Sequence, residues 1–144
     1  MKKRIDIIAS QPGAYKAMSA LEGYLKASSL NPIHKELIKI RASQINGCAY
    51  CINMHTRDAR KLGETEQRIY LLNAWRETDL YTEEERAILA LTEEVTNIKN
   101  SVSDETYQKA AELFDSTYLS EIVMAIVTIN SWNRLAITSQ KELD

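Results

Sequence analysis

The sequence has few residues that interrupt helices and few cysteines. Only four glycines and two prolines occur among 144 residues, which argues against a turn-rich β architecture and against long flexible linkers. Two cysteines are too few for the disulfide framework of a small secreted protein. We therefore expect the two thiols to have a chemical role, in a chain that stays in the reducing cytoplasm.

The sequence also lacks a charge bias and a long hydrophobic run. Its 18 basic and 20 acidic residues give a net charge of -2 and are interspersed along the chain, which disfavours a nucleic-acid-binding surface. The longest apolar stretch, 122–129, is far shorter than the roughly 20 residues that cross a bilayer. The basic start, 1–4, resembles a signal peptide, but Asp6 and Gln11-Pro12 interrupt the apolar segment that should follow. The sequence predicts neither a nucleic-acid partner nor a membrane location.

What the chain does contain is apolar residues at helical spacing. A hydrophobic content of 44% is enough for one core, so we expect residues 1–144 to form a single all-α domain of six to seven helices. Glycine, proline and capping residues divide the pattern into helices over 12–28, 32–46, 48–63, a segment through 69, 72 and 75, 82–95, 103–114 and 117–139. The last is rich in Val and Ile, yet a single strand would have no partner, so a helix is favoured.

Two cysteines and a histidine are predicted to share one face of the third helix. Cys48 and Cys51 lie three residues apart, and His55 follows four residues after the second cysteine. At about 100° per residue, all three side chains fall on one narrow strip of the helix. The unpaired N–H groups of the first helical turn favour the thiolate of Cys48, which is the reactive form of cysteine. The spacing indicates a redox-active dithiol at the start of a central helix.

A carboxylate is predicted to face this strip from the preceding helix. Glu36 shares the inward stripe of Ile33, Leu37 and Ile40, and a turn at Asn46-Gly47 would bring it opposite His55. Glu36 could then orient and charge His55, which would move a proton to or from the thiols. Helical rotation places Tyr50 on another face, where it is a weaker candidate for the relay. His34 projects about 200° from Glu36, which indicates a surface or interface position.

Each of these residues also has a plainer interpretation. Cys48 and Cys51 could be small buried hydrophobic residues, His55 a structural histidine and Glu36 a surface carboxylate. The four could instead bind zinc, although structural zinc sites usually take their ligands from two separated pairs. A non-enzymatic redox sensor, or a general disulfide oxidoreductase, would use the same dithiol. The shared geometry favours dithiol chemistry over the plain interpretations.

The order of these residues resembles a known family. Glu36, eleven intervening residues, Cys48-x-x-Cys51, three residues and then His55 resemble the pattern of the AhpD-like alkylhydroperoxidases of the carboxymuconolactone decarboxylase superfamily. The likeness covers 32–62 most closely, and the segment 82–95 and the last helix resemble short single-repeat members. It implies an AhpD-like helical bundle that forms homo-oligomers such as trimers or hexamers.

The resemblance also implies an activity and a reductant. Cys48 and Cys51 match the pair that reduces hydroperoxides through a disulfide, and Glu36 and His55 match the proton relay. No cofactor is implied; lipoylated or thioredoxin-like donors would restore the thiols. The best-studied members have a histidine immediately before the second cysteine, where this chain has Tyr50. A phenol with a pKa near 10 cannot replace an imidazole as a base at neutral pH, although it can donate a hydrogen bond.

Overall fold

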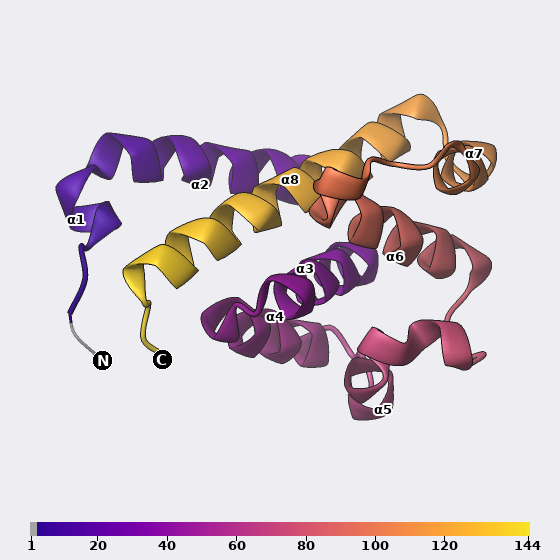
Figure 1. Ribbon diagram of the computed structural model, residues 1–144, viewed down its shortest axis with the longest axis horizontal. Coiled ribbons are helices and arrows are strands. Elements are labelled where there is room, and N and C mark those ends of the chain that lie inside the picture. Colours follow the sequence, from indigo (N-terminus) through magenta and orange to yellow (C-terminus); the bar gives the residue numbers. More distant parts are fainter. Residues whose placement is uncertain (1–2) are drawn as a thin grey trace.

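The computed structural model describes residues 3–144, and within that range the regular structure is entirely helical (Figure 1). Eight α-helices are joined by short turns: α1 (Ile7–Ser10), α2 (Pro12–Ala27), α3 (Pro32–Asn46), α4 (Ala49–Lys61), α5 (Glu66–Tyr70), α6 (Glu83–Thr96), α7 (Asp104–Leu113) and α8 (Ser116–Ser139). Two 3-10 helices, η1 (Leu72–Glu77) and η2 (Ile98–Asn100), complete the chain. The predicted all-α class is confirmed.

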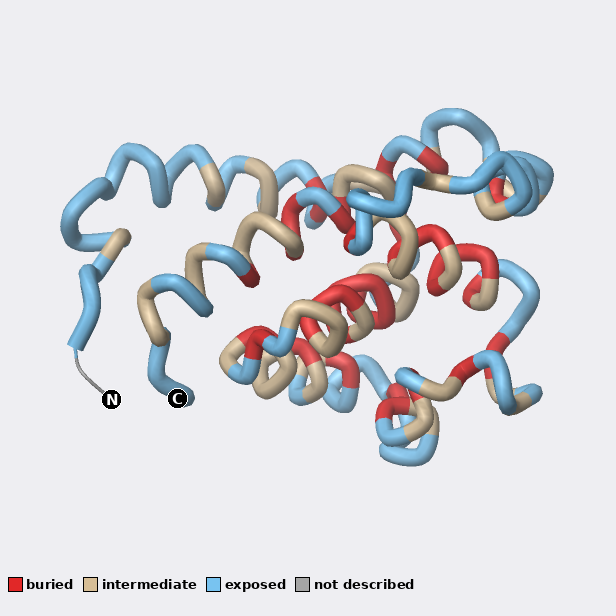
Figure 2. The backbone as a smooth tube through the Cα atoms, viewed as in Figure 1, coloured by how far each residue is buried: buried red, intermediate tan, exposed pale blue. Residues whose placement is uncertain are grey.

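Helix α3 lies at the centre of the bundle, in contact with α4, α6 and α8. Buried residues gather on α3, on α6 and along the middle of α8, whereas α2 is exposed over most of its length (Figure 2). Fully buried side chains of α3 face in several directions, among them Leu37, Ile38 and Ile40. Each such side chain contributes about 1.5–3 kcal/mol through the hydrophobic effect. The surrounding helices therefore hold α3, and the carboxylate that it carries, in a fixed place.

The boundary between α3 and α4 follows from local capping chemistry. Pro32 occupies the first turn of α3, and the side chain of Asn31 accepts a hydrogen bond from the Ile33 N–H. Gly47 ends α3 in a left-handed conformation with φ 70°, which costs glycine little because it has no Cβ. Cys48 follows as the N-cap of α4. Glycine at this position reverses the chain, so α3 and α4 pack against each other.

A network of buried amides fixes this turn to α8. The Asn46 side-chain amide donates hydrogen bonds to the side-chain oxygens of Asn130 and Asn133, both at 2.9 Å. Asn133, which is fully buried, donates in turn to the Ser43 hydroxyl at 2.9 Å. Because an unpaired buried amide is costly, these bonds hold the turn and α8 in one register.

Two carboxylates of α6, those of Glu85 and Glu93, anchor the segment from α5 to η1. Arg68 donates to both Glu64 and Glu85, in contacts of 2.7–3.1 Å. Glu93 accepts hydrogen bonds from Arg41, Arg76 and the Trp75 indole. Burial alone would raise the pKa of Glu93, but these three donors outweigh it and lower the pKa below its usual value.

Most predicted boundaries agree with the observed helices to within one or two residues, and the Thr82–Glu85 capping box is confirmed. The prediction of one regular helix through 69, 72 and 75 was wrong. That segment divides into α5 and η1, and Ala74 has a non-helical conformation (φ -117°, ψ 25°). Fixed hydrogen bonds to α6 determine its path, and apolar spacing does not report them. The short α1 and η2 were not predicted.

Candidate functional site

The structure shows the two cysteines joined in a disulfide, with their Cα atoms 5.3 Å apart. Cys48 lies at the N-cap, one residue before the helical turn in which it was predicted, and its Sγ accepts a hydrogen bond from the Cys51 N–H at 3.3 Å. Cys48 is 1% exposed and Cys51 4% exposed. The sulfur pair therefore sits at the positive end of a helix, in a largely water-excluded setting.

Glu36 and His55 meet between α3 and α4, as the sequence predicts. The His55 Nδ1 and the Glu36 Oε2 are 2.9 Å apart, and both residues are buried. A bond between these atoms fixes the imidazole ring and leaves Nε2 as the atom that can exchange a proton. Among residues 3–144, every fully buried side-chain nitrogen and oxygen has a hydrogen-bond partner. Nε2 of His55 has none, so it must retain some accessible surface.

Asp58 is a neighbour of this pair that the sequence analysis missed. Ligand atoms of Glu36, His55 and Asp58 all lie within 4.8 Å of one another. Asp58 follows His55 by three residues on α4, and that spacing could have revealed it. The alternative zinc set of Cys48, Cys51, His55 and Glu36 is not available in this structure, because the disulfide occupies both sulfurs.

Tyr50 contacts the C-terminal end of the chain. Its hydroxyl lies 3.5 Å from a carboxylate oxygen of Asp144, and the Lys141 Nζ lies 4.8 Å from the centre of its ring. Tyr50 thus packs between residues that follow α8 and the buried cluster that contains Cys48 and Cys51. Sequence spacing could not show this contact, because 91 to 94 residues separate the partners.

His34 lies apart from the dithiol. Its Nδ1 is 2.8 Å from the Tyr118 hydroxyl, which also accepts a hydrogen bond from the Asn31 N–H. The Tyr118 hydroxyl therefore joins the start of α3 to α8 through two contacts. The side chain is partly buried, and burial lowers the pKa of His34 below its usual value despite the nearby charges of Glu85 and Glu84. His34 is thus a bridge between α3 and α8 and not the free surface residue that the prediction allowed.

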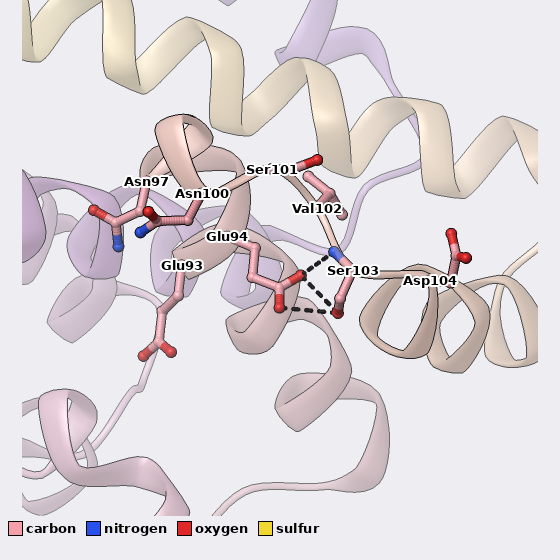
Figure 3. Close-up of a pocket in the computed structure, with 8 residues that line it drawn as sticks. All are labelled: Glu93, Glu94, Asn97, Asn100, Ser101, Val102, Ser103 and Asp104. Carbon is pink, nitrogen blue, oxygen red and sulfur yellow. Dashed lines mark hydrogen bonds between the residues drawn. The ribbon is translucent and has the colours of Figure 1, made fainter.

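A polar hollow of about 570 Å³ lies at the C-terminal end of α6, where η2 leads into α7 (Figure 3). Its lining includes Glu94, which accepts hydrogen bonds from the backbone N–H and the hydroxyl of Ser103. Figure 3 shows the Glu94 carboxylate directed at Ser103, whereas the Glu93 side chain points away from it. These bonds hold Ser103, the N-cap residue of α7, in place. The carboxylate of Glu94 in this hollow therefore has a structural role.

The fold and the site together define an all-helical protein with a Cys-x-x-Cys disulfide served by a buried histidine and glutamate. The model of the carboxymuconolactone decarboxylase family matches residues 12–94, which contain the whole site. The chain belongs to this family. The match includes more than half of the chain and confirms the resemblance that residues 36–55 indicate.

Relatives extend the likeness over nearly the full length. The uncharacterized protein YdfG of Bacillus subtilis is 50% identical over 138 residues, which cover 95% of this chain and 94% of that protein. A solved structure of ATU0492 from Agrobacterium tumefaciens, a protein of unknown function proposed to be the antioxidant defence protein AhpD, has a TM-score of 0.96 at 40% identity and covers 99% of each chain. The debrominase Bmp8 shares the fold at 20% identity, with a TM-score of 0.85 over 95% of this chain and 74% of that one.

Proposed function

We propose that the protein is a thiol-dependent peroxidase that reduces hydroperoxides through a Cys48–Cys51 dithiol–disulfide cycle. The observation that carries the proposal is the 2.9 Å contact between buried His55 and Glu36, next to a disulfide on the same helix. A disulfide alone would fit many roles. A fixed imidazole four residues after Cys51 supplies the proton transfer that peroxide reduction requires.

The positions of the two sulfurs favour different roles for Cys51 and Cys48 in the cycle. Cys51 is one helical turn before His55, so His55 can take the Cys51 thiol proton. The thiolate then attacks the outer peroxide oxygen, the O–O bond breaks, and the departing alkoxide takes the proton from His55 to leave as an alcohol. Cys51 becomes a sulfenic acid. The Cys48 sulfur attacks it, the hydroxyl leaves as water with the Cys48 proton, and the disulfide forms.

Cys48 suits the second, resolving role. Its Sγ already accepts the Cys51 N–H at 3.3 Å, and this bond, together with the start of α4, stabilises a negative sulfur. The same stabilisation makes Cys48 a good leaving group when an external thiol reduces the disulfide, because low-pKa thiolates leave faster. A lipoylated or thioredoxin-like donor of two electrons would complete the cycle.

The test is hydroperoxide consumption by reduced wild-type protein and by Cys48→Ser and Cys51→Ser. We expect Cys51→Ser to consume no peroxide above background. Cys48→Ser should complete one turnover and stop as a sulfenic acid that a dimedone probe traps. The proposal fails if both serine variants consume peroxide at the wild-type rate.

A redox sensor or general disulfide oxidoreductase is the alternative use of the same residues. The near-complete burial of both sulfurs favours it, because a buried disulfide can signal through packing as well as through turnover. Rapid, stoichiometric disulfide formation with negligible steady-state turnover would support this alternative. Sustained turnover with a dithiol reductant would support the peroxidase.

We also propose that the protein forms a homo-oligomer and resides in the cytoplasm. Large apolar side chains are exposed on adjacent helices: Tyr15 and Tyr24 on α2, Val127 and Ile137 on α8. Exposed apolar residues grouped in this way are common at subunit interfaces. Within residues 3–144, no helix combines the length and the apolar character needed to cross a bilayer. Light scattering after size exclusion would give the number of subunits, a trimer or hexamer being expected.

A further inference from the structure

The Glu36–His55 pair has a second carboxylate beside it whose role the cycle above does not use. Asp58 presents an oxygen within 4.8 Å of the ligand atoms of both residues. Its side chain is 42% exposed, whereas those of His55 and Glu36 are 10% and 8% exposed. Asp58 therefore stands between a buried imidazole–carboxylate pair and water.

Helix geometry fixes this arrangement. Asp58 and His55 are three residues apart on α4, so their side chains project from the same face one turn apart. The buried Ala59 anchors this turn of the helix. The only ion pair that the described structure gives Asp58 is with Lys61, at 3.5 Å between Oδ1 and Nζ. Because the Lys61 side chain is 76% exposed, water weakens its hold on the carboxylate.

We infer that Asp58 is a positioning residue of the relay: with Glu36, it stabilises the protonated form of His55 that arises when His55 takes a thiol proton. The physical basis is Coulomb attraction between an imidazolium and a carboxylate, which is stronger beside buried groups than in bulk water. Glu36 holds Nδ1 by a direct bond, and Asp58 adds a second negative charge without closing the site to solvent.

This inference rests on the proposed role of His55 as the proton carrier. Its test nevertheless does not need a peroxide. Oxidation of the reduced dithiol by a small aromatic disulfide also requires deprotonation of the thiols. Two protein S–H bonds break, one protein S–S bond forms, the aromatic disulfide is cleaved to two thiolates, and two protons pass to water.

The decisive measurement is the protonation state of His55 in reduced wild-type protein and in Asp58→Asn, compared at the same pH across the range in which the wild-type ring gains its proton. The chain has only two histidines, so long-range ¹H–¹⁵N spectra resolve both rings. We expect the His55 nitrogens of the Asn variant to move toward the neutral pattern. The His34 nitrogens should stay in place, because His34 bonds to Tyr118 and serves as an internal control.

Rates provide the second readout. Asp58→Asn should slow thiol oxidation by the aromatic disulfide by about 3- to 10-fold, the order expected for one partly screened charge. Asp58→Glu should restore most of the rate, because it keeps the charge on the same face. Asp79→Asn, the same substitution at an exposed position before α6, should react as the wild type does.

The outcomes separate cleanly. The inference is overturned if the His55 nitrogens do not move in Asp58→Asn, or if that variant reacts at the wild-type rate. A slower Asn variant with unchanged His55 signals would show a purely structural role and would also overturn it. If the wild-type protein does not consume hydroperoxides but Asp58→Asn behaves as described, the peroxidase proposal fails and the relay assignment stands.

Discussion

Replacing Glu36 by Gln tests the relay at its most buried point. Glutamine has nearly the same shape and keeps an oxygen that can accept a hydrogen bond from Nδ1–H of His55. The substitution therefore removes the charge and preserves the packing between α3 and α4. Since Glu36 and His55 contact each other at 2.9 Å with little exposure to water, most of any change in rate can be assigned to that charge.

The size of the effect follows from the kind of bond that is lost. Hydrogen bonds to charged groups contribute about 1.5–3 kcal/mol, compared with about 1 kcal/mol for neutral pairs. Glutamine keeps a neutral bond, so the expected loss is the difference, about 0.5–2 kcal/mol. At about 1.36 kcal/mol for each factor of ten, Glu36→Gln should slow thiol oxidation by about 2- to 30-fold. His55→Ala removes the proton carrier itself and should cost about 100- to 10,000-fold.

The assay is loss of free thiols after rapid mixing of reduced protein with an organic hydroperoxide. The matched control is Glu121→Gln, which also changes a carboxylate that is only 6% exposed. Glu121 accepts hydrogen bonds from the backbone N–H and hydroxyl of Ser29, and it lies on α8 and not on the two helices that carry the relay. It should react as the wild type does, while thermal unfolding shows whether each variant keeps its fold.

The double variant Glu36→Gln/His55→Ala decides whether the two residues act as one unit. If Glu36 works only through His55, adding Glu36→Gln to His55→Ala causes little further loss, and the coupling energy equals the loss caused by Glu36→Gln alone, about 0.5–2 kcal/mol. Two results would refute this reasoning: a wild-type rate in Glu36→Gln, or losses that simply multiply in the double variant.

Three further predictions concern the surroundings of the site. Gly47→Ala should lower the free energy of unfolding by about 1–2 kcal/mol, measured by urea denaturation, because φ is 70° at this position; an unchanged value would contradict it. The lowered pKa of Glu93 contributes stability that is present above its unfolded pKa of 4.5 and is lost as the pH falls through the lower, folded value. Glu93→Gln should therefore flatten the decline in melting temperature below about pH 4.5. An equally steep decline in the variant would refute this. Tyr50→Phe should oxidise within about twofold of the wild-type rate, since its hydroxyl faces Asp144 and not the relay; a tenfold slower reaction would return Tyr50 to the relay.

How far the sequence predicts this site depends on whether the information is local. Cys48, Cys51 and His55 lie on one helix, so periodicity alone places them together. Glu36 comes from the neighbouring helix, and its position was predictable because Gly47 forces a tight reversal between the two. Asp58 was equally local, three residues after His55, and was missed because a partly exposed carboxylate on a helix is usually only a surface residue.

Contacts between distant parts of the chain limit how much of the fold the sequence pattern can predict. The path through α5 and η1 is determined by hydrogen bonds from Arg68 and Arg86 to groups that periodicity does not reveal. Likewise, Lys141 and Asp144 come to Tyr50 only after α8 has packed along α3. These contacts depend on the completed fold, which a pattern of apolar residues specifies only in outline.

The arrangement of charge at the site gives the disulfide and His55 different electrostatic surroundings, although they lie on successive turns of one short helix. The N-terminal end of α4 favours negative sulfur, whereas the two carboxylates beside His55, Glu36 on α3 and Asp58 on α4, form the acidic surroundings to which we assign the charge of the relay. A thiolate and an imidazolium are the two products of one proton transfer from Cys51 to His55. On this proposal the start of α4 stabilises the thiolate, whereas carboxylates from α3 and α4 stabilise the imidazolium, and separate losses are expected when either part is changed.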